Sequence, residues 1–182
     1  TSQTYWTEEA KLTASDAADG DAYSYSVDID GDYAICSALN EDPGGTSNAG
    51  SAYIYKRTGS NWEQQAKIQA SDKAQDDKFG RGVTISGDYA AVGADQEDTT
   101  ASNAGSVYIF KRSGTNWSQQ KKIQASDAEA DDTFGGGAGQ GVSLSGDYLA
   151  VGARQEDTSG SQAGSVYIFK KNELGRAWPP SA

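Results

Sequence analysis

The chain has 182 residues, and its 26 acidic side chains outnumber its 15 lysines and arginines, giving a formal net charge of -11. Such a surface repels nucleic acid and anionic lipid, so we expect no nucleic-acid partner. No apolar run approaches the roughly 20 residues of a membrane-spanning helix, so we expect no membrane insertion. One Cys and no His exclude a disulfide framework, a His-based zinc site and a Ser-His-Asp or Cys-His centre within one chain. The sequence begins without Met and shows no signal-type segment, from which we expect a processed or trimmed chain.

One pattern occurs three times along the chain. Its opening tryptophans, Trp6, Trp62 and Trp117, are separated by 56 and 55 residues, but the GDY triplets at Gly87 and Gly146 are separated by 59. The third copy therefore holds four additional residues near 136–139, within the stretch GGGAGQG. We name the copies repeat 1 (1–61), repeat 2 (62–116) and repeat 3 (117–171), which a tail (172–182) follows. Such a period is typical of architectures that stack one small unit.

Each repeat is expected to form four short strands, as repeat 2 shows. Its predicted strands are 62–70, 82–86, 89–94 and 106–112. The turn SGDY between the second and third strands is typical of a tight hairpin. The last strand carries Val107 and Ile109 on one face and Tyr108 and Phe110 on the other, so the sheet is expected to be covered on both sides. We predict an all-β protein with three four-stranded antiparallel sheets of the β-propeller blade type, each opened by its Trp strand.

The same residues resemble a known family. The stretch DKFGRGVTISGDYAAVGA at 77–94, followed by NAGSVYIFKR at 103–112, is similar to the FG-GAP repeat, and most closely to its Trp-initiated variant. The resemblance implies integrin-α-like propeller blades, an extracellular or cell-surface location, and a role in adhesion and ligand binding. Repeat 1 departs most from the pattern, because Tyr23-Ser24 replaces Phe-Gly and Ser37-Ala38 replaces Gly-Ala.

The family resemblance also implies calcium, which integrin-type repeats hold in a D-x-D-x-D-G-like loop between the second and third strands. Here that loop is reduced to SGDY in two repeats and DIDGDY in the first. Calcium takes six to eight oxygen ligands, which a tight hairpin does not supply. We therefore do not transfer the family's calcium site to Asp28, Asp30 and Asp32.

A second acidic set recurs in all three repeats. A D-x-x-x-x-D pattern lies between the first and second predicted strands, and a Glu-Asp pair lies between the third and fourth. In an antiparallel up-and-down sheet these two loops lie at the same end, so both are expected at one rim of the blade. These candidate calcium ligands are Asp16, Asp21, Glu41, Asp42, Asp72, Asp77, Glu97, Asp98, Asp127, Asp132, Glu156 and Asp157. We favour the alternative that the aspartates accept hydrogen bonds from nearby turn N–H groups. The sequence suggests no cofactor other than this calcium.

Other residues are candidates for interfaces or modification. Trp6, Trp62 and Trp117 form either blade-to-blade packing anchors, which we favour, or a platform for stacking sugars. The glycines of the insertion, Gly136, Gly137 and Gly139, are candidates for an interface or a ligand contact. Asn116 opens the sequon NWS in a predicted turn and is a glycosylation candidate.

Three blades are fewer than the four to eight that usually close a propeller. We expect two open end faces, lined by residues such as Ile54, Val107 and Phe169. The chain is then part of a longer propeller, or it self-associates as a closed homo-oligomer or a head-to-tail filament. With no catalytic constellation, we predict a non-enzymatic extracellular structural or adhesion module that works through self-assembly or protein contacts. The alternative is a carbohydrate-binding propeller with one weak site per blade.

Overall fold

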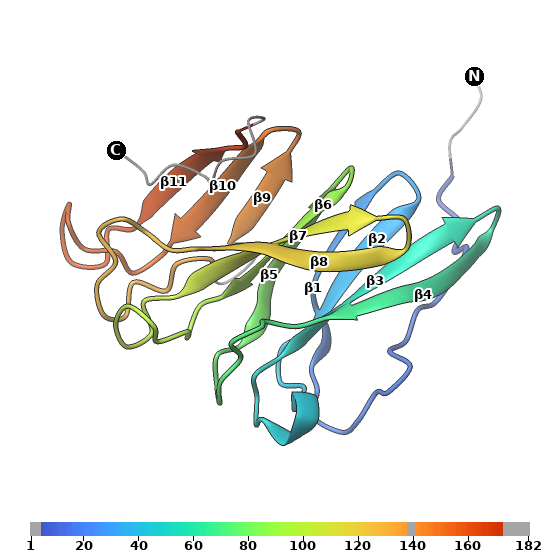
Figure 1. Ribbon diagram of the computed structural model, residues 1–182, viewed down its shortest axis with the longest axis horizontal. Coiled ribbons are helices and arrows are strands. Elements are labelled where there is room, and N and C mark those ends of the chain that lie inside the picture. Colours follow the sequence, from blue (N-terminus) through green and yellow to red (C-terminus); the bar gives the residue numbers. More distant parts are fainter. Residues whose placement is uncertain (1–4, 138–140, 173–182) are drawn as a thin grey trace.

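The computed structural model describes residues 5–137 and 141–172. They form three antiparallel sheets of four, four and three strands, which follow one another along the long axis of the molecule (Figure 1). Apart from one short 3-10 turn, η1 (Pro43–Gly45), the described residues contain no helix. The prediction of an all-β protein built from propeller-type sheets is confirmed.

Each sheet is a meander in which successive strands are neighbours, and we name the sheets blades 1 to 3. Blade 1 consists of β1 (Tyr23–Asp30), β2 (Tyr33–Ala38), β3 (Ser51–Thr58) and β4 (Asn61–Ile68). Blade 2 consists of β5 (Phe79–Ser86), β6 (Tyr89–Ala94), β7 (Ser106–Ser113) and β8 (Asn116–Ile123). Blade 3 consists of β9 (Val142–Ser145), β10 (Tyr148–Ala153) and β11 (Ser165–Lys170).

Glycines at the tips of the hairpins set the strand order. Gly31, Gly87 and Gly146 each adopt a positive φ, between 56° and 57°, at the first position of the two-residue loop that joins the first two strands of a blade. Gly59 and Gly114 do the same between the third and fourth strands of blades 1 and 2. Glycine occupies this backbone region without steric cost, which allows the strands to reverse within two residues.

The strand that contains the repeated Trp belongs to the preceding sheet, and our assignment of it as the first strand of its own blade is wrong. Trp62 lies opposite Arg57 in the β3–β4 ladder, and Trp117 lies opposite Arg112 in the β7–β8 ladder. The physical reason is local, since the two-residue loop at Gly59 folds the chain straight back onto β3. Sequence repeats and sheets are therefore offset by one strand, and blade 3 has three strands within the described residues.

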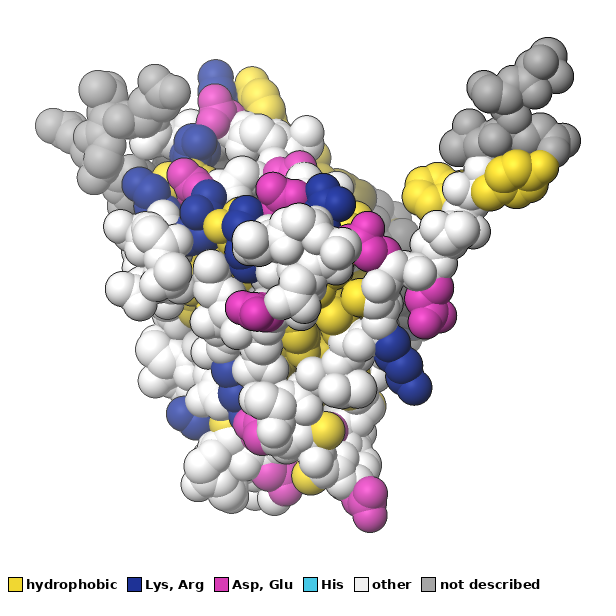
Figure 2. Space-filling view, turned by 90° about the vertical axis from the view of Figure 1, so that its right-hand side faces the viewer, with side chains coloured by type: hydrophobic (Ala, Val, Ile, Leu, Met, Phe, Trp, Pro, Cys, Tyr) yellow, Lys and Arg dark blue, Asp and Glu magenta, His cyan; other side chains and the backbone are white. Residues whose placement is uncertain are grey.

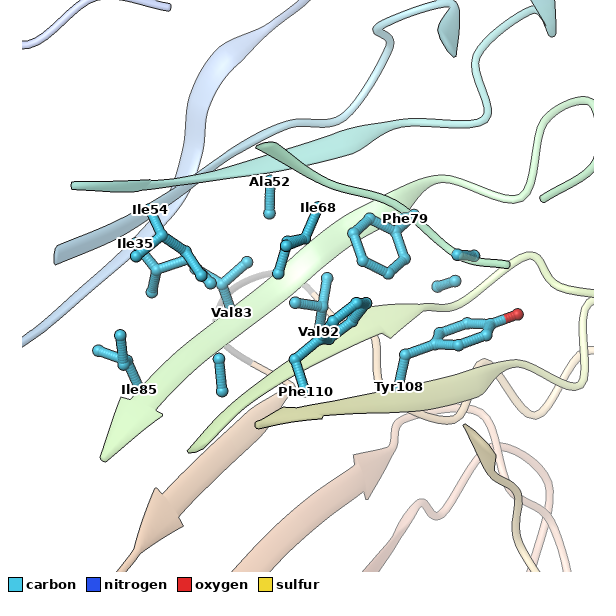
Figure 3. Packing of buried hydrophobic residues seen from close by; sticks show 13 residues of the cluster. Ile35, Ala52, Ile54, Ile68, Phe79, Val83, Ile85, Val92, Tyr108 and Phe110 are labelled. Carbon is cyan, nitrogen blue, oxygen red and sulfur yellow. The ribbon is translucent and has the colours of Figure 1, made fainter. Parts of the chain in front are cut away.

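The core lies in the seams between consecutive blades. In the first seam, Ile35 and Ile54 of blade 1 pack against Val83 of blade 2, as Figure 3 shows. Each of these side chains is at most 1% exposed. The second seam repeats this arrangement, with Ile109 of blade 2 against Val142 of blade 3. Ile54 and Val107 thus lie inside seams, and Phe169 is buried too, so the expectation that these residues line open end faces is wrong.

A backbone contact closes each seam at one rim. The N–H of Phe79 donates to the carbonyl of Ala49 at 2.9 Å, and the N–H of Phe134 donates to Ala104 at 2.9 Å. The glycine that follows each alanine is pressed against the incoming chain. A Cβ on Gly105 would lie 2.3 Å from the carbonyl oxygen of Phe134, a distance that real Cβ atoms do not reach. The Ala-Gly turn therefore serves as the docking point for the next blade.

The glycine-rich insertion of repeat 3 lies at the second seam. A Cβ on Gly136 would lie 2.1 Å from Cβ of Asp95 in blade 2, and one on Gly93 would lie 2.0 Å from the carbonyl oxygen of Gly135. A Cβ on Gly137 would have no atom within 4 Å, and Gly139 lies outside the described residues. Gly136 thus faces the preceding blade of the same chain.

The Gly105→Ala variant tests the docking contact. Alanine at a φ of 85° costs about 1–2 kcal/mol, and the clash with Phe134 adds about 1–3 kcal/mol. Urea unfolding at pH 7 is expected to show a loss of about 3 kcal/mol in the free energy of unfolding. Gly114→Ala is the control, because Gly114 has a φ of 64° but no atom within 4 Å of its Cβ position, so only the first cost applies. Equal losses in the two variants would contradict the role assigned to the contact.

Candidate functional site

In blades 1 and 2, one aspartate and one glutamate of the predicted acidic set meet around a lysine of the fourth strand. In blade 1, Lys67 on β4 lies 2.7 Å from Asp16 and 2.8 Å from Glu41, measured from its Nζ to the nearest carboxylate oxygens. The hydroxyl of Tyr53 donates to Asp16 at 2.9 Å, and that of Ser51 donates to Glu41 at 2.5 Å. Lys67 holds the pKa of Asp16 below its usual value. The two loops share one rim, as the sequence predicts.

Blade 2 repeats this arrangement. Lys122 on β8 lies 2.8 Å from both Asp72 and Glu97. Burial opposes the ionisation of both carboxyl groups, but Lys122 outweighs it, so their pKa values lie below the usual range. Glu97 also accepts a hydrogen bond from Ser106 at 2.6 Å. The ammonium group of the lysine occupies the position between the carboxylates that a metal ion would need.

The corresponding carboxylates of blade 3 have no lysine partner among the described residues. Asp127 accepts a hydrogen bond from the hydroxyl of Tyr167 at 2.8 Å, as Asp16 does from Tyr53. Glu156 accepts hydrogen bonds from Ser165 and from the N–H of Thr158, and these hold its pKa below the usual value. The site of blade 3 therefore has the same anionic residues as the other two, without their cation.

The second aspartate of each pattern accepts a hydrogen bond from the backbone of its own turn. Asp21, Asp77 and Asp132 each bind the N–H three residues before them, at 2.6 to 2.7 Å. Asp42 and Asp98 likewise accept from the N–H groups of Asn48 and Asn103. Asp157 accepts through its backbone carbonyl, from Gly160.

The hairpin aspartates of repeat 1 bind protein groups as well. Asp28 accepts from the N–H of Ile85 at 2.9 Å, and Asp30 from the N–H of Gly87 at 2.7 Å, so both join blade 1 to blade 2. Asp32 pairs with Arg57 at 2.9 Å. Within 5–137 and 141–172, no three acidic, His or Cys side chains are grouped to hold a metal ion.

The repeated tryptophans have different environments. Trp117 contacts blade 1, where its ring lies 6.3 Å from that of Tyr33 and its N–H donates to Gln65 at 3.0 Å. Trp62 donates to Glu9 at 3.1 Å, whereas Trp6 is fully exposed. Asn116 begins β8 and is exposed, so its glycosylation stays a prediction.

Exposed hydrophobic side chains mark both ends of the row of blades. On the outer face of blade 1, Val27 is 59% exposed and Ile29 is 62% exposed, whereas Val83, the blade 2 equivalent of Val27, is fully buried. On the outer face of blade 3, Val166 is 70% exposed and Ile168 is 62% exposed. Sequence reasoning missed these four residues, although repeat alignment with the buried seam residues identifies them.

Each exposed end is also hollowed. A cavity of about 380 Å³ on blade 1 is lined by Val27, Ile29 and Cys36, among others. Figure 2 views the molecule from this side and shows hydrophobic side chains in a hollow beside the extended N-terminal segment. A cavity of about 550 Å³ on blade 3 is lined by Gly152, Gly164 and Val166, among others. Cys36 itself is 7% exposed.

The Lys122→Met variant tests the ion pairs of the rim. Glu97, with a side chain only 7% exposed, would lose its cation, and we expect about 2–3 kcal/mol less stability in denaturant unfolding at pH 7. Because Lys122 lowers the pKa of Glu97 below 4.5, the pair's stabilisation is present above pH 4.5 and is lost as the pH falls through the lowered pKa, so the deficit should shrink there. Lys111→Met, on an exposed lysine, is the control. A deficit of the same size at acid pH would contradict the assignment.

The raised pKa of Asp77 predicts a change of unfolding free energy with pH that is opposite in sign to that of the Lys122 ion pairs. Its burial, aided by the charges of Glu97 and Asp72, raises its pKa from 3.8 to about 6. The folded state therefore holds this proton more tightly than the unfolded state, so the contribution to stability decreases as the pH rises from about 4 through 6. Asp77→Asn keeps an acceptor for the N–H of Ala74, and should flatten the slope of unfolding free energy in this interval. An unchanged slope would rule Asp77 out as its source.

The match to a known family agrees with this architecture. Among the described residues, no helix combines the length and apolar character needed to cross a membrane. No curated protein matches the chain. A family model described as FG-GAP repeat matches residues 6–55, 62–110 and 117–169, so each match begins at a repeated Trp. Because the three matches together cover well over half of the chain, the protein belongs to the FG-GAP repeat family.

Proposed function

We propose that this protein is a non-enzymatic, extracellular structural or adhesion module that works through self-association of its blades. FG-GAP repeats are typical of β-propeller-like interaction modules, and the family is generally non-enzymatic. The extracellular location and the structural role rest on that family membership and on the acidic composition, with its net charge of -11. A subunit of a filament or a surface coat is the specific form of this proposal.

The observation that carries the proposal is the pair of exposed hydrophobic end faces. Val27 and Ile29 at one end, and Val166 and Ile168 at the other, occupy positions that are buried in the internal seams, apart from Leu144, the half-buried equivalent of Ile29 in blade 3. Contiguous apolar surface of this kind marks interaction sites in soluble proteins. The two faces are different surfaces, so contact between them is heterologous and joins copies into a ring or an open filament.

Carbohydrate binding, the alternative function, has less support. A sugar platform needs aromatic rings that are open to solvent on one face, but Trp117 packs against Tyr33 across the first seam and donates its N–H to Gln65. Trp62 is partly buried and packs against the hydrophobic cluster of blade 1 that contains Ala14 and Tyr55. Of the three repeated tryptophans, Trp6 alone is fully exposed.

Light scattering at micromolar concentration tests self-association. We expect a mass that is a multiple of the 19.1 kDa chain and that decreases on dilution. Burial of the apolar end faces is expected to drive the association. A single species of monomer mass across the whole concentration range would refute the self-association proposal.

A further inference from the structure

We propose that the outer face of blade 3 binds the outer face of blade 1 from a second copy of this chain, in the register of the internal seams. Residues 6–12 of that copy then form the fourth strand of blade 3. This inference rests on the proposed self-association and names its surfaces and its register. The repeats supply the evidence, because the chain contains two complete seams with which the two exposed ends can be compared.

The N-terminal segment already lies where the fourth strand of a preceding blade would lie. In the first seam, Trp117 on β8 donates to Gln65 on β4, and the N–H of Ser71 donates to Gln119. One repeat earlier, Trp62 on β4 donates to Glu9, the equivalent of Gln65. The N–H of Ser15 likewise donates to Gln64, as that of Ser71 does to Gln119. Residues 6–12 thus hold the position of β4 but have no sheet to join within the described residues.

Blade 3 offers the complementary vacancy. In blades 1 and 2, the third strand pairs with a fourth, but β11 has no neighbour on its outer edge among the described strands (Figure 1). An unpaired edge is a template for another strand. The pairs Ile54↔Ala66 and Ile109↔Lys121 predict that Ala10 lies opposite Ile168.

The same register supplies the missing cation. Lys67 lies opposite Tyr53, and Lys122 lies opposite Tyr108, so Lys11 should lie opposite Tyr167. Lys67 and Lys122 each reach one aspartate and one glutamate from that position. Lys11 would accordingly reach Asp127 and Glu156, which lack a lysine among the described residues. Lys11 itself is exposed and pairs with no described carboxylate. An unpaired lysine and an unpaired acidic site therefore match across the two ends.

The hydrophobic seam is divided between the two ends in the same way. A cluster on blade 1 contains equivalents of first-seam residues, among them the buried Ala14, Tyr53 and Tyr55, with Leu12 packed against it. It has no counterpart of Ile35, Ala52 and Ile54, which β2 and β3 of the preceding blade supply in the first seam, and Val27 and Ile29 remain outside it. The blade 3 equivalents of Ile35, Ala52 and Ile54 are Ala150, Val166 and Ile168. The two end faces are thus the separated halves of one seam.

The cavity on blade 3 corresponds to the site that the aromatic-Gly pair fills in the internal seams. It is lined by Gly152, Gly164 and Ser165, whose equivalents in blade 1, Ser37, Gly50 and Ser51, lie against Phe79-Gly80. Repeat 1 has Tyr23-Ser24 in place of Phe-Gly. Gly152 has no protein atom closer than 3.9 Å to its Cβ position, which leaves space for the larger Ser24.

The tail is a poorer candidate for this edge. Trp178 follows Lys171 by seven residues, against five from Arg112 to Trp117. Pro179 and Pro180 come next, where the ladder of β8 continues, and proline has no N–H to donate.

Site-directed cross-linking tests the register in the full chain. Cys36→Val removes the only cysteine of the sequence. The substitution should be tolerated, because valine occupies the equivalent position in the other two repeats. In that background, Ala10→Cys with Ile168→Cys should form an intermolecular disulfide on mild oxidation, seen as a closed dimer or a ladder on a non-reducing gel. The control pair, Ala10→Cys with Val166→Cys, lies two residues out of register and should cross-link at least about tenfold less, because a disulfide requires Cβ atoms about 4 Å apart.

Mixing two face variants tests the polarity of the contact. Ile29→Asp and Ile168→Asp alter residues that are each 62% exposed, so both chains should fold. Each variant alone should be monomeric, because one of its two faces is blocked, but an equimolar mixture should form a dimer through the intact faces. Lys11→Glu should weaken association at least about tenfold, whereas Lys73→Glu, the same charge change on a loop lysine, should not.

The outcomes separate this inference from the proposed function. A wild-type oligomer in which the two cysteine pairs cross-link equally would leave self-association standing and overturn the register. A disulfide within one chain would show that the chain's own N-terminal segment reaches the edge, and would overturn the second copy as partner. A monomer in light scattering would refute both proposals. A mixture that stays monomeric while wild type assembles would overturn the head-to-tail contact.

Discussion

The contact between an Ala-Gly turn and the incoming aromatic-Gly strand is the constraint on which the structure depends. At Gly50 and Gly105 the next chain segment passes so close that a Cβ would lie 2.1 and 2.3 Å from a carbonyl oxygen. This contact, with the hydrogen bond from Phe79 or Phe134 beside it, sets the offset of one blade against the next. The aliphatic side chains of the seam can interdigitate only at that offset, since packed cores tolerate little displacement.

The acidic rim follows from the same arrangement. A chain with a net charge of -11 gathers carboxylates at one edge of each blade, and this is stable where a lysine from the fourth strand lies between them. Lys67 and Lys122 supply that charge within their own blades. The position of the lysine in the fourth strand links electrostatics to blade completion, because a blade without its fourth strand also lacks its cation. Blade 3 is in that condition within the described residues.

Much of the fold could be predicted from the sequence because its signals are local. Alternating apolar residues and positive-φ glycines identify the strands and hairpins, and the spacing of the tryptophans identifies the repeats. The offset between repeat and sheet could not be predicted in the same way, since it depends on whether Trp62 pairs backward with β3 or forward with β5. The shared rim was predictable from strand order, but the lysine within it was not, because Lys67 lies 51 residues from Asp16.

The sequence by itself determined the unit of this protein: its strands, its tight turns, its family and the number of its repeats. These depend on side-chain periodicity and backbone preference over a few residues. The tertiary structure alone decided which surfaces remain open. Val27 and Val83 occupy the same place in their repeats, yet one is 59% exposed and the other is buried, because within the described residues only the second lies against a preceding blade. The burial of a residue depends on neighbours that are distant in the sequence. The residues of one repeat therefore do not determine which of its faces is covered.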